Sequence, residues 1–152
     1  MGHGRVWRRF AESRRNPPRR ASQTGPMTIR IQCISIDADD QSAQAKWWAD
    51  ALGWTVTFED EEEAAVEPPA DQNNIVPDLL FIKVPHRKSH KNRLHFDLRP
   101  DDQATEIARF EALGATRVDV GQSADSSWVV MADPESNEFC ILRALTPEEL
   151  AE

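Results

Sequence analysis

Three polar side chains recur at every second position of a strand-like segment in the middle of the chain. They are His95, Asp97 and Arg99, and the residues between them are apolar. Alternation with a period of two is typical of a β-strand with one packed face and one polar face. A neutral imidazole on the polar face can bind a metal or act as a general base, and it can equally belong to a structural hydrogen-bond network. We therefore take His95 as the candidate catalytic residue and Asp97 and Arg99 as candidate ligand-binding residues.

Three residues elsewhere in strand-like segments are further candidates for ligand binding. Trp128 lies in SSWVVMAD and can offer a flat surface to an aromatic ligand if it points away from the core. Cys140 lies in EFCILR, where a thiol is more often a small buried hydrophobic group than a nucleophile, and nothing in its immediate sequence suggests the cationic setting that lowers a thiol pKa. Gln32 is an uncharged amide, a type that usually makes structural hydrogen bonds.

The chain repeats itself over the segments that hold these residues. Residues 30–56, RIQCISIDADDQSAQAKWWADALGWTV, match residues 93–118, RLHFDLRPDDQATEIARFEALGATRV. Both copies run from a strand pattern through Asp-Asp-Gln into a segment that ends in Ala-Leu-Gly. An aspartate can cap the start of a helix and a glycine can close its end, so we predict helices over residues 40–52 and 101–113.

Three strand-like segments follow each predicted helix. They are WTVTFED, EEAAVEP and LLFIKV in the first copy, and TRVDV, SSWVVMAD and EFCILR in the second. We therefore predict an α+β fold of two βαβββ modules, over about residues 27–88 and 93–145 of one domain that spans 27–145. Residues 146–152 form a short C-terminal tail that can make one capped helical turn.

Charge is unevenly distributed along the chain. Residues 1–26 hold seven arginines and one acidic residue, whereas residues 27–152 hold 11 basic and 25 acidic residues. An acidic body repels phosphate backbones, so we expect no specific binding of nucleic acid. No segment approaches the roughly 20 apolar residues of a membrane-spanning helix, and two cysteines without paired spacing favour a reducing cytoplasm.

Residues 1–26 contain few large apolar residues and three prolines, so we expect a disordered basic extension. Three interpretations of it remain open. They are a natural start at Met27, a flexible basic arm that contacts an anionic partner, and a leader peptide.

The two βαβββ units, the phrase ALGW, the opening KNRLHFDLRP and the closing DPESNEFCIL resemble the glyoxalase, bleomycin-resistance and extradiol dioxygenase superfamily, also called vicinal oxygen chelate. The resemblance covers about residues 27–145 and points to its glyoxalase-like domains. It implies that the two sheets form a curved, incompletely closed barrel with the helices outside and a ligand cleft inside. Ser136 stands where such proteins usually have glycine.

The resemblance also implies a set of metal ligands. In metal-dependent members the first and last strands of each module supply one ligand apiece. Gln32, His95 and Cys140 take three of these positions, and the fourth falls near Leu80, which cannot bind a metal. The implied cofactor is a divalent metal, Ni, Zn, Mn or Fe. Glu138 shares the strand parity of Cys140 and is the alternative ligand if the register differs.

Two functions follow from these expectations. The first is a cytoplasmic enzyme that binds a small organic molecule in the cleft of the paired modules and acts as a metal-dependent lyase, isomerase or dioxygenase. The second is a protein that binds and sequesters a drug-like compound without turnover. The polar residues from His95 to Arg99 favour the first, and the incomplete ligand set favours the second. The resemblance also implies a homodimer.

Overall fold

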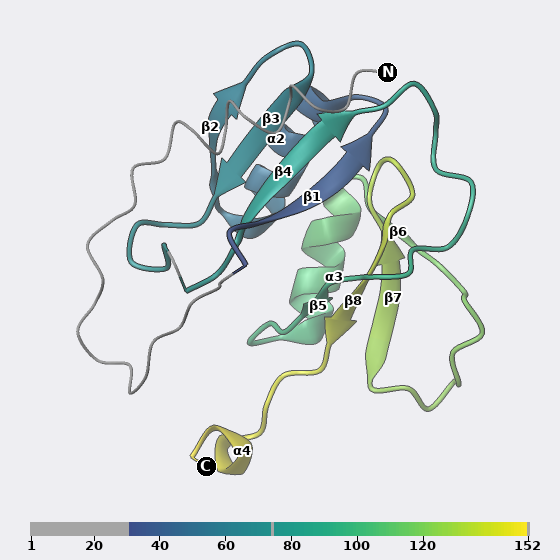
Figure 1. The fold of residues 1–152 in the computed structure, drawn as a ribbon. Coiled ribbons are helices and arrows are strands. Elements are labelled where there is room, and N and C mark those ends of the chain that lie inside the picture. Colours follow the sequence, from purple (N-terminus) through teal and green to yellow (C-terminus); the bar gives the residue numbers. More distant parts are fainter. Residues whose placement is uncertain (1–30, 74, 152) are drawn as a thin grey trace. The chain divides into compact units, whose positions relative to one another are not determined.

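The computed structural model describes residues 31–73 and 75–151 and divides the chain into two compact units (Figure 1). The boundary between the units falls between Lys83 and Val84. The basic extension expected over residues 1–26 lies outside the described residues.

The first unit is a four-stranded mixed sheet with one helix. It contains β1 (Cys33–Ala38), α2 (Gln41–Leu52), β2 (Thr55–Glu59), β3 (Glu63–Glu67) and β4 (Asp78–Lys83). The strand order is β1-β4-β3-β2, and only the β1–β4 pair is parallel. The helix packs on β3 and β4, where it buries Trp48.

The second unit has the same topology. It contains β5 (Asp97–Leu98), α3 (Gln103–Ala112), β6 (Thr116–Arg117), β7 (Trp128–Ala132) and β8 (Glu138–Leu142), followed by the short helix α4 (Pro147–Leu150). The strand order is β5-β8-β7-β6, and again the first strand pairs in parallel with the last. The predicted α+β fold of two βαβββ modules is confirmed, whereas the barrel shared by both sheets stays a prediction.

Both predicted helices are present, but α2 begins one residue after the predicted start, and α3 begins two residues later and ends one residue earlier than predicted. Asp40 and Asp102 cap α2 and α3, because a side-chain oxygen of each accepts a hydrogen bond from the backbone N–H three residues later, at 2.9 Å and 2.7 Å. Gly53 closes α2 in the left-handed conformation, with φ of 66°. The two Asp-Asp-Gln segments therefore act as helix starts.

Two strands of the second unit are shorter than the sequence predicts. Before β5, the backbone N–H of Asn92 donates to Glu138 Oε2 at 2.9 Å, so the chain is bound to a side chain there instead of a strand ladder. After β6, the Gln122 side chain donates to the Val118 carbonyl and accepts from the Val120 N–H. Side-chain bonds thus occupy backbone groups at both places, although the Val118 N–H still donates to the Val130 carbonyl at 3.0 Å.

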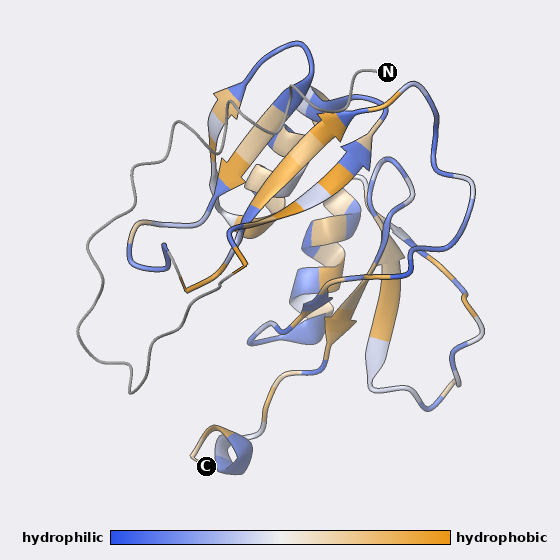
Figure 2. Cartoon of the chain, viewed as in Figure 1, coloured by the Kyte–Doolittle hydropathy of each residue, from blue (hydrophilic) through white to orange (hydrophobic). Residues whose placement is uncertain are grey.

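Apolar residues concentrate on the strands of each unit, and the loops are mainly hydrophilic (Figure 2). In the second unit, the α3 residue Phe110 contacts Phe139 of β8, with ring centroids 5.2 Å apart. The face of β8 that holds Phe139 and Ile141 is therefore the packed face. Within the described part of the chain, neither the length nor the apolarity of any helix is sufficient to cross a membrane.

Candidate functional site

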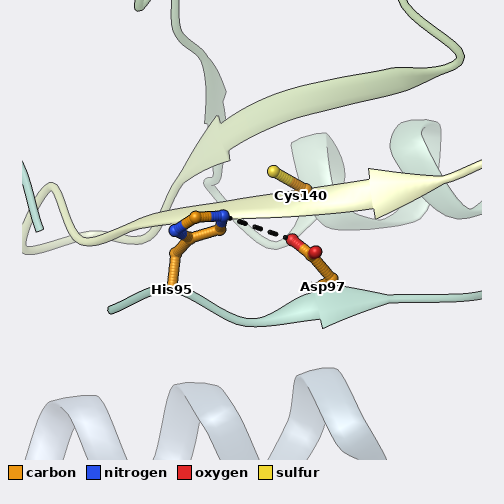
Figure 3. A group of neighbouring side chains, drawn as sticks. All are labelled: His95, Asp97 and Cys140. Carbon is orange, nitrogen blue, oxygen red and sulfur yellow. Dashed lines mark ion pairs between the residues drawn. The ribbon is translucent and has the colours of Figure 1, made fainter. Parts of the chain in front are cut away.

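Three chemically active side chains meet on the second sheet, on the face opposite the helix-packed one. They are His95, Asp97 and Cys140, and one ligand atom of each lies within 4.8 Å of the other two (Figure 3). Figure 3 shows His95 and Asp97 on the β5 segment and the Cys140 side chain on the neighbouring strand. We call these three residues the ligand cluster.

Strand pairing explains why the cluster forms. Asp97 and Cys140 are direct partners in the parallel β5–β8 pair, so their side chains point to the same face. The Cys140 N–H donates to the Phe96 carbonyl at 2.8 Å and holds this register. His95 lies two residues before Asp97 and shares its face, so its Nε2 lies 3.5 Å from Asp97 Oδ1.

The members of the cluster differ in their access to solvent. The side chains of His95 and Asp97 are 41% and 53% exposed, whereas Cys140 is buried. Burial and a hydrogen bond with the Asp97 carboxylate raise the pKa of the Cys140 thiol to about 11. The thiol is therefore protonated at neutral pH, and without a metal it is a poor nucleophile.

Glu138 also lies on this face of β8 but is held by other groups. Its Oε1 pairs with Lys88 Nζ at 2.9 Å, and its Oε2 accepts from the Asn92 N–H at 2.9 Å. Partial burial opposes ionisation of Glu138, but these two contacts prevail and its pKa is lowered. The register thus brings Cys140, rather than Glu138, next to Asp97.

Trp128 lies on the same face as the cluster. It pairs with Leu142 in the β7–β8 ladder, two residues from the pair between Val130 and Cys140, and residues two apart on a strand share a face. The indole is 41% exposed, so an aromatic surface is available near the cluster. Its predicted role in ligand binding stays a prediction.

Arg99 and Gln32 are placed by contacts outside the cluster. Arg99 Nη1 donates to the Arg143 carbonyl at 2.7 Å, beyond the end of β8. Gln32 belongs to the first unit, where its Nε2 donates to Asp78 Oδ2 at 3.2 Å. Their predicted roles in a site also stay predictions.

The first unit carries a counterpart of the cluster that has other chemistry. Ser35 pairs with Leu80 in the parallel β1–β4 pair, as Asp97 pairs with Cys140. His95 lies two residues before Asp97, so its counterpart in the first unit is Cys33, two residues before Ser35, rather than Gln32. Leu80 packs with Ala65 in an apolar cluster that Cys33 borders. The potential metal ligands are thus concentrated in the second module.

Asp97 as a potential metal ligand was missed by the sequence analysis, which assigned it only to ligand binding. The signal was present, because alternation puts Asp97 on the same face as His95. The resemblance implies a single metal ligand from each first strand, so it does not predict a second donor on this strand.

An open hollow of about 630 Å³ lies elsewhere, at the start of α2 in the first unit. Its lining is mainly acidic. Within it, the Glu59 carboxylate accepts hydrogen bonds from Ser42 Oγ and Lys46 Nζ, which belong to α2. The lining residues are Asp39, Asp40, Gln41, Ser42, Glu59, Asp60, Glu61 and Lys83. Because Asp40, Glu59 and Asp60 in this lining already accept hydrogen bonds, the ligand cluster is the better candidate site.

Comparisons with known proteins place these observations in a family context. A family model described as a glyoxalase-like domain matches residues 33–142, which include both sheets and the whole ligand cluster. No curated protein matches the chain.

Solved structures resemble the chain across both modules. Oxidase ChaP-H2 is 20% identical, with a TM-score of 0.56, over 80% of this chain and 98% of that one. A glyoxalase/bleomycin resistance protein/dioxygenase family enzyme from Burkholderia phytofirmans PsJN is 15% identical, with a TM-score of 0.61, over 77% and 100%. A bleomycin-binding protein from Streptomyces verticillus, complexed with copper(II)-bleomycin, is 17% identical, with a TM-score of 0.53, over 79% and 100%. At such identities the similarity shows the fold alone.

Proposed function

Because the chain belongs to the glyoxalase-like domain family, we propose that it binds a small organic molecule at the ligand cluster, with a divalent metal held by His95, Asp97 and Cys140. The observation that carries this proposal is the convergence of a nitrogen, an oxygen and a sulfur ligand atom within 4.8 Å. A nitrogen, oxygen and sulfur set suits Zn²⁺, and three protein ligands with an open position are typical of catalytic zinc sites.

The residues fit a metal after a small adjustment. Tetrahedral bonds of about 2.0–2.3 Å separate ligand atoms by about 3.5 Å, so the cluster would contract by about 1 Å. The two exposed side chains can make this movement, since His95 and Asp97 are only partly packed. The Cys140 thiol must also lose its proton, and coordination to a metal favours that loss. Metal binding is therefore expected to release a proton.

The surrounding residues would orient a bound molecule. A metal in the cluster supplies a Lewis acid that polarises an oxygen of the substrate. In the metal-free site, exposed His95 could instead accept or return a proton at Nε2, which lies 3.5 Å from Asp97 Oδ1. Trp128 offers a flat surface for an apolar or aromatic part of the molecule. These roles support a lyase, isomerase or dioxygenase of glyoxalase type.

Binding without turnover is the second candidate, and one observation favours it. The first module carries Ser35 and Leu80 at the positions of Asp97 and Cys140. The first module therefore has no counterpart of the Asp97 carboxylate and the Cys140 thiol. The bleomycin-binding protein shows that a protein with this fold can bind an organic molecule. We place either function in the cytoplasm, in a homodimer.

Metal binding separates the two candidates. The full-length protein is purified, its metal content is measured, and its thermal unfolding is followed with Ni²⁺, Zn²⁺, Mn²⁺ and Fe²⁺. We expect one metal per chain and a higher unfolding temperature, because a ligand at a hundredfold its Kd adds about 2.7 kcal/mol to the free energy of unfolding. His95→Ala should abolish both effects.

His86→Ala is the matched control, because His86 is an exposed histidine of the same unit that does not belong to the cluster. This variant should keep the metal and the thermal shift. Failure of all four metals to bind or to stabilise the wild-type protein would contradict the metal-dependent enzyme and leave binding without turnover. Equal metal loss in both variants would show that the metal lies elsewhere.

A further inference from the structure

The exposed cation Lys91 lies close enough to the ligand cluster to act on Cys140. Its side chain is exposed, and within residues 31–73 and 75–151 it makes no hydrogen bond or ion pair. Its positive charge nevertheless acts on Cys140, where it opposes the effects of burial and of Asp97. Lys91 is thus an available cation within electrostatic reach of the cluster.

The loop that carries Lys91 is held in place from both sides. Lys88 Nζ pairs with Glu138 Oε1, and the Asn92 N–H donates to Glu138 Oε2, both at 2.9 Å. Glu138 lies on β8 two residues before Cys140, on the same face. Because Lys88 and Asn92 flank Lys91, this one carboxylate fixes the approach of the loop to the cluster.

The charges on this face leave room for one added negative group. Lys88 neutralises Glu138, and Asp97 lies next to His95. A divalent metal would balance the Asp97 carboxylate and a Cys140 thiolate, so the positive charges of Lys91 and of Arg99, whose Nη1 donates to the Arg143 carbonyl, would remain to attract an anion. Since the rest of the protein is acidic, an anion would be attracted locally at this position.

We propose that the molecule bound at the ligand cluster is a small organic carboxylate, and that Lys91 pairs with its carboxylate group. This inference rests on the proposed function, because it names the class of molecule that the same site would bind. A carboxylate is favoured over a phosphate, because phosphates are typically held by arginine forks or several backbone N–H groups, and Lys91 supplies one point charge. Lys91 is accordingly a specificity-determining residue.

A matched pair of probes tests the inference. 2-Naphthoate and 2-naphthamide have nearly the same shape but differ in charge, and each is titrated into ¹⁵N-labelled full-length protein while amide shifts of residues 88–97 are followed by NMR. We expect the wild-type protein to bind the naphthoate roughly threefold to fivefold more tightly, the ratio that an exposed ion pair supports. Added salt should reduce the preference.

Three variants assign the preference to Lys91. Lys91→Gln should bind both probes equally, and Lys91→Arg should keep the preference because it keeps the positive charge. Lys83→Gln removes an exposed lysine of the first unit and should behave as the wild type.

Equal binding of the two probes by the wild-type protein would overturn the inference. A preference that survives in Lys91→Gln, or the absence of saturable shifts with either probe, would overturn it as well. Metal content separates this failure from that of the proposed function, since a protein that keeps its metal through His95 but shows no charge preference loses only the carboxylate assignment.

Discussion

At the scale of single residues, the burial of Cys140 opposes the ionisation of its thiol, which metal binding would require. Burial first, and the hydrogen bond with Asp97 second, raise the pKa of the thiol to about 11. Both effects keep the sulfur protonated at neutral pH, whereas a metal ligand must be a thiolate. Metal uptake at the cluster should therefore become tighter as pH rises.

The raised pKa of Cys140 predicts a loss of stability in alkali. The unfolded thiol ionises near pH 9 and the folded thiol near pH 11, so its contribution is fully present below pH 9 and is lost as pH rises to 11. Allowing for access of water, the loss should be about 1 kcal/mol. Urea unfolding of the metal-free protein at several pH values measures it.

Cys140→Ser lacks the ionising group and should show a shallower fall in stability over this range. Cys33→Ser is the control, because Cys33 is the other cysteine of the chain. The absence of tyrosine in the sequence leaves fewer other groups that titrate there. Identical pH profiles for wild type and Cys140→Ser would contradict the raised pKa.

At the scale of elements, the turn between β7 and β8 aligns the strand that carries Cys140. Asp133 Oδ1 accepts from the backbone N–H groups of Glu135 and Asn137, at 3.0 Å and 2.8 Å. Ser136 has a φ of 68°, and it is the only non-glycine residue with positive φ among the described residues. The left-handed conformation explains why glycine is expected at this position.

Ser136→Gly should stabilise the turn. A side chain in the left-handed region costs about 1–2 kcal/mol, and part of the gain is offset by the greater freedom of glycine in the unfolded chain. We expect the free energy of unfolding to rise by roughly 0.5–1 kcal/mol, as measured by urea denaturation. Ala124→Gly, in an exposed loop of the same unit without positive φ, should give no such gain. A decrease in stability for Ser136→Gly would show that the serine side chain contributes more than the backbone strain costs.

At the scale of the whole molecule, one topology serves two chemical environments. Both units pair their first and last strands in parallel, but one pair holds Ser35 and Leu80 and the other holds Asp97 and Cys140. Duplication of the fold therefore does not duplicate the candidate site. The family resemblance explains the fold, and the residues of the second module carry the functional proposal.

The second unit also exposes apolar side chains that suggest association. Leu94 is 86% exposed and Trp128 is 41% exposed, and exposed apolar groups are enriched at protein interfaces. We expect light scattering after gel filtration to give a mass near twice 17.2 kDa. Leu94→Asp should shift the protein towards the monomer, whereas Leu150→Asp, which is 71% exposed in α4, should not. A monomeric wild-type protein at micromolar concentration would refute the homodimer.

The sequence by itself determined the repeat, the two helices with their aspartate caps, the type of each module and the face of β5 that holds His95 and Asp97. These features depend on neighbours within a few residues, and local hydrogen bonds and alternation encode them. Only the tertiary structure decided that Cys140, and not Glu138, lies next to Asp97, and that Lys88 and Asn92 hold Lys91 near the cluster. Those facts depend on the register between strands more than 40 residues apart. A shift of one residue in that register would turn Cys140 away from the cluster without changing any local pattern.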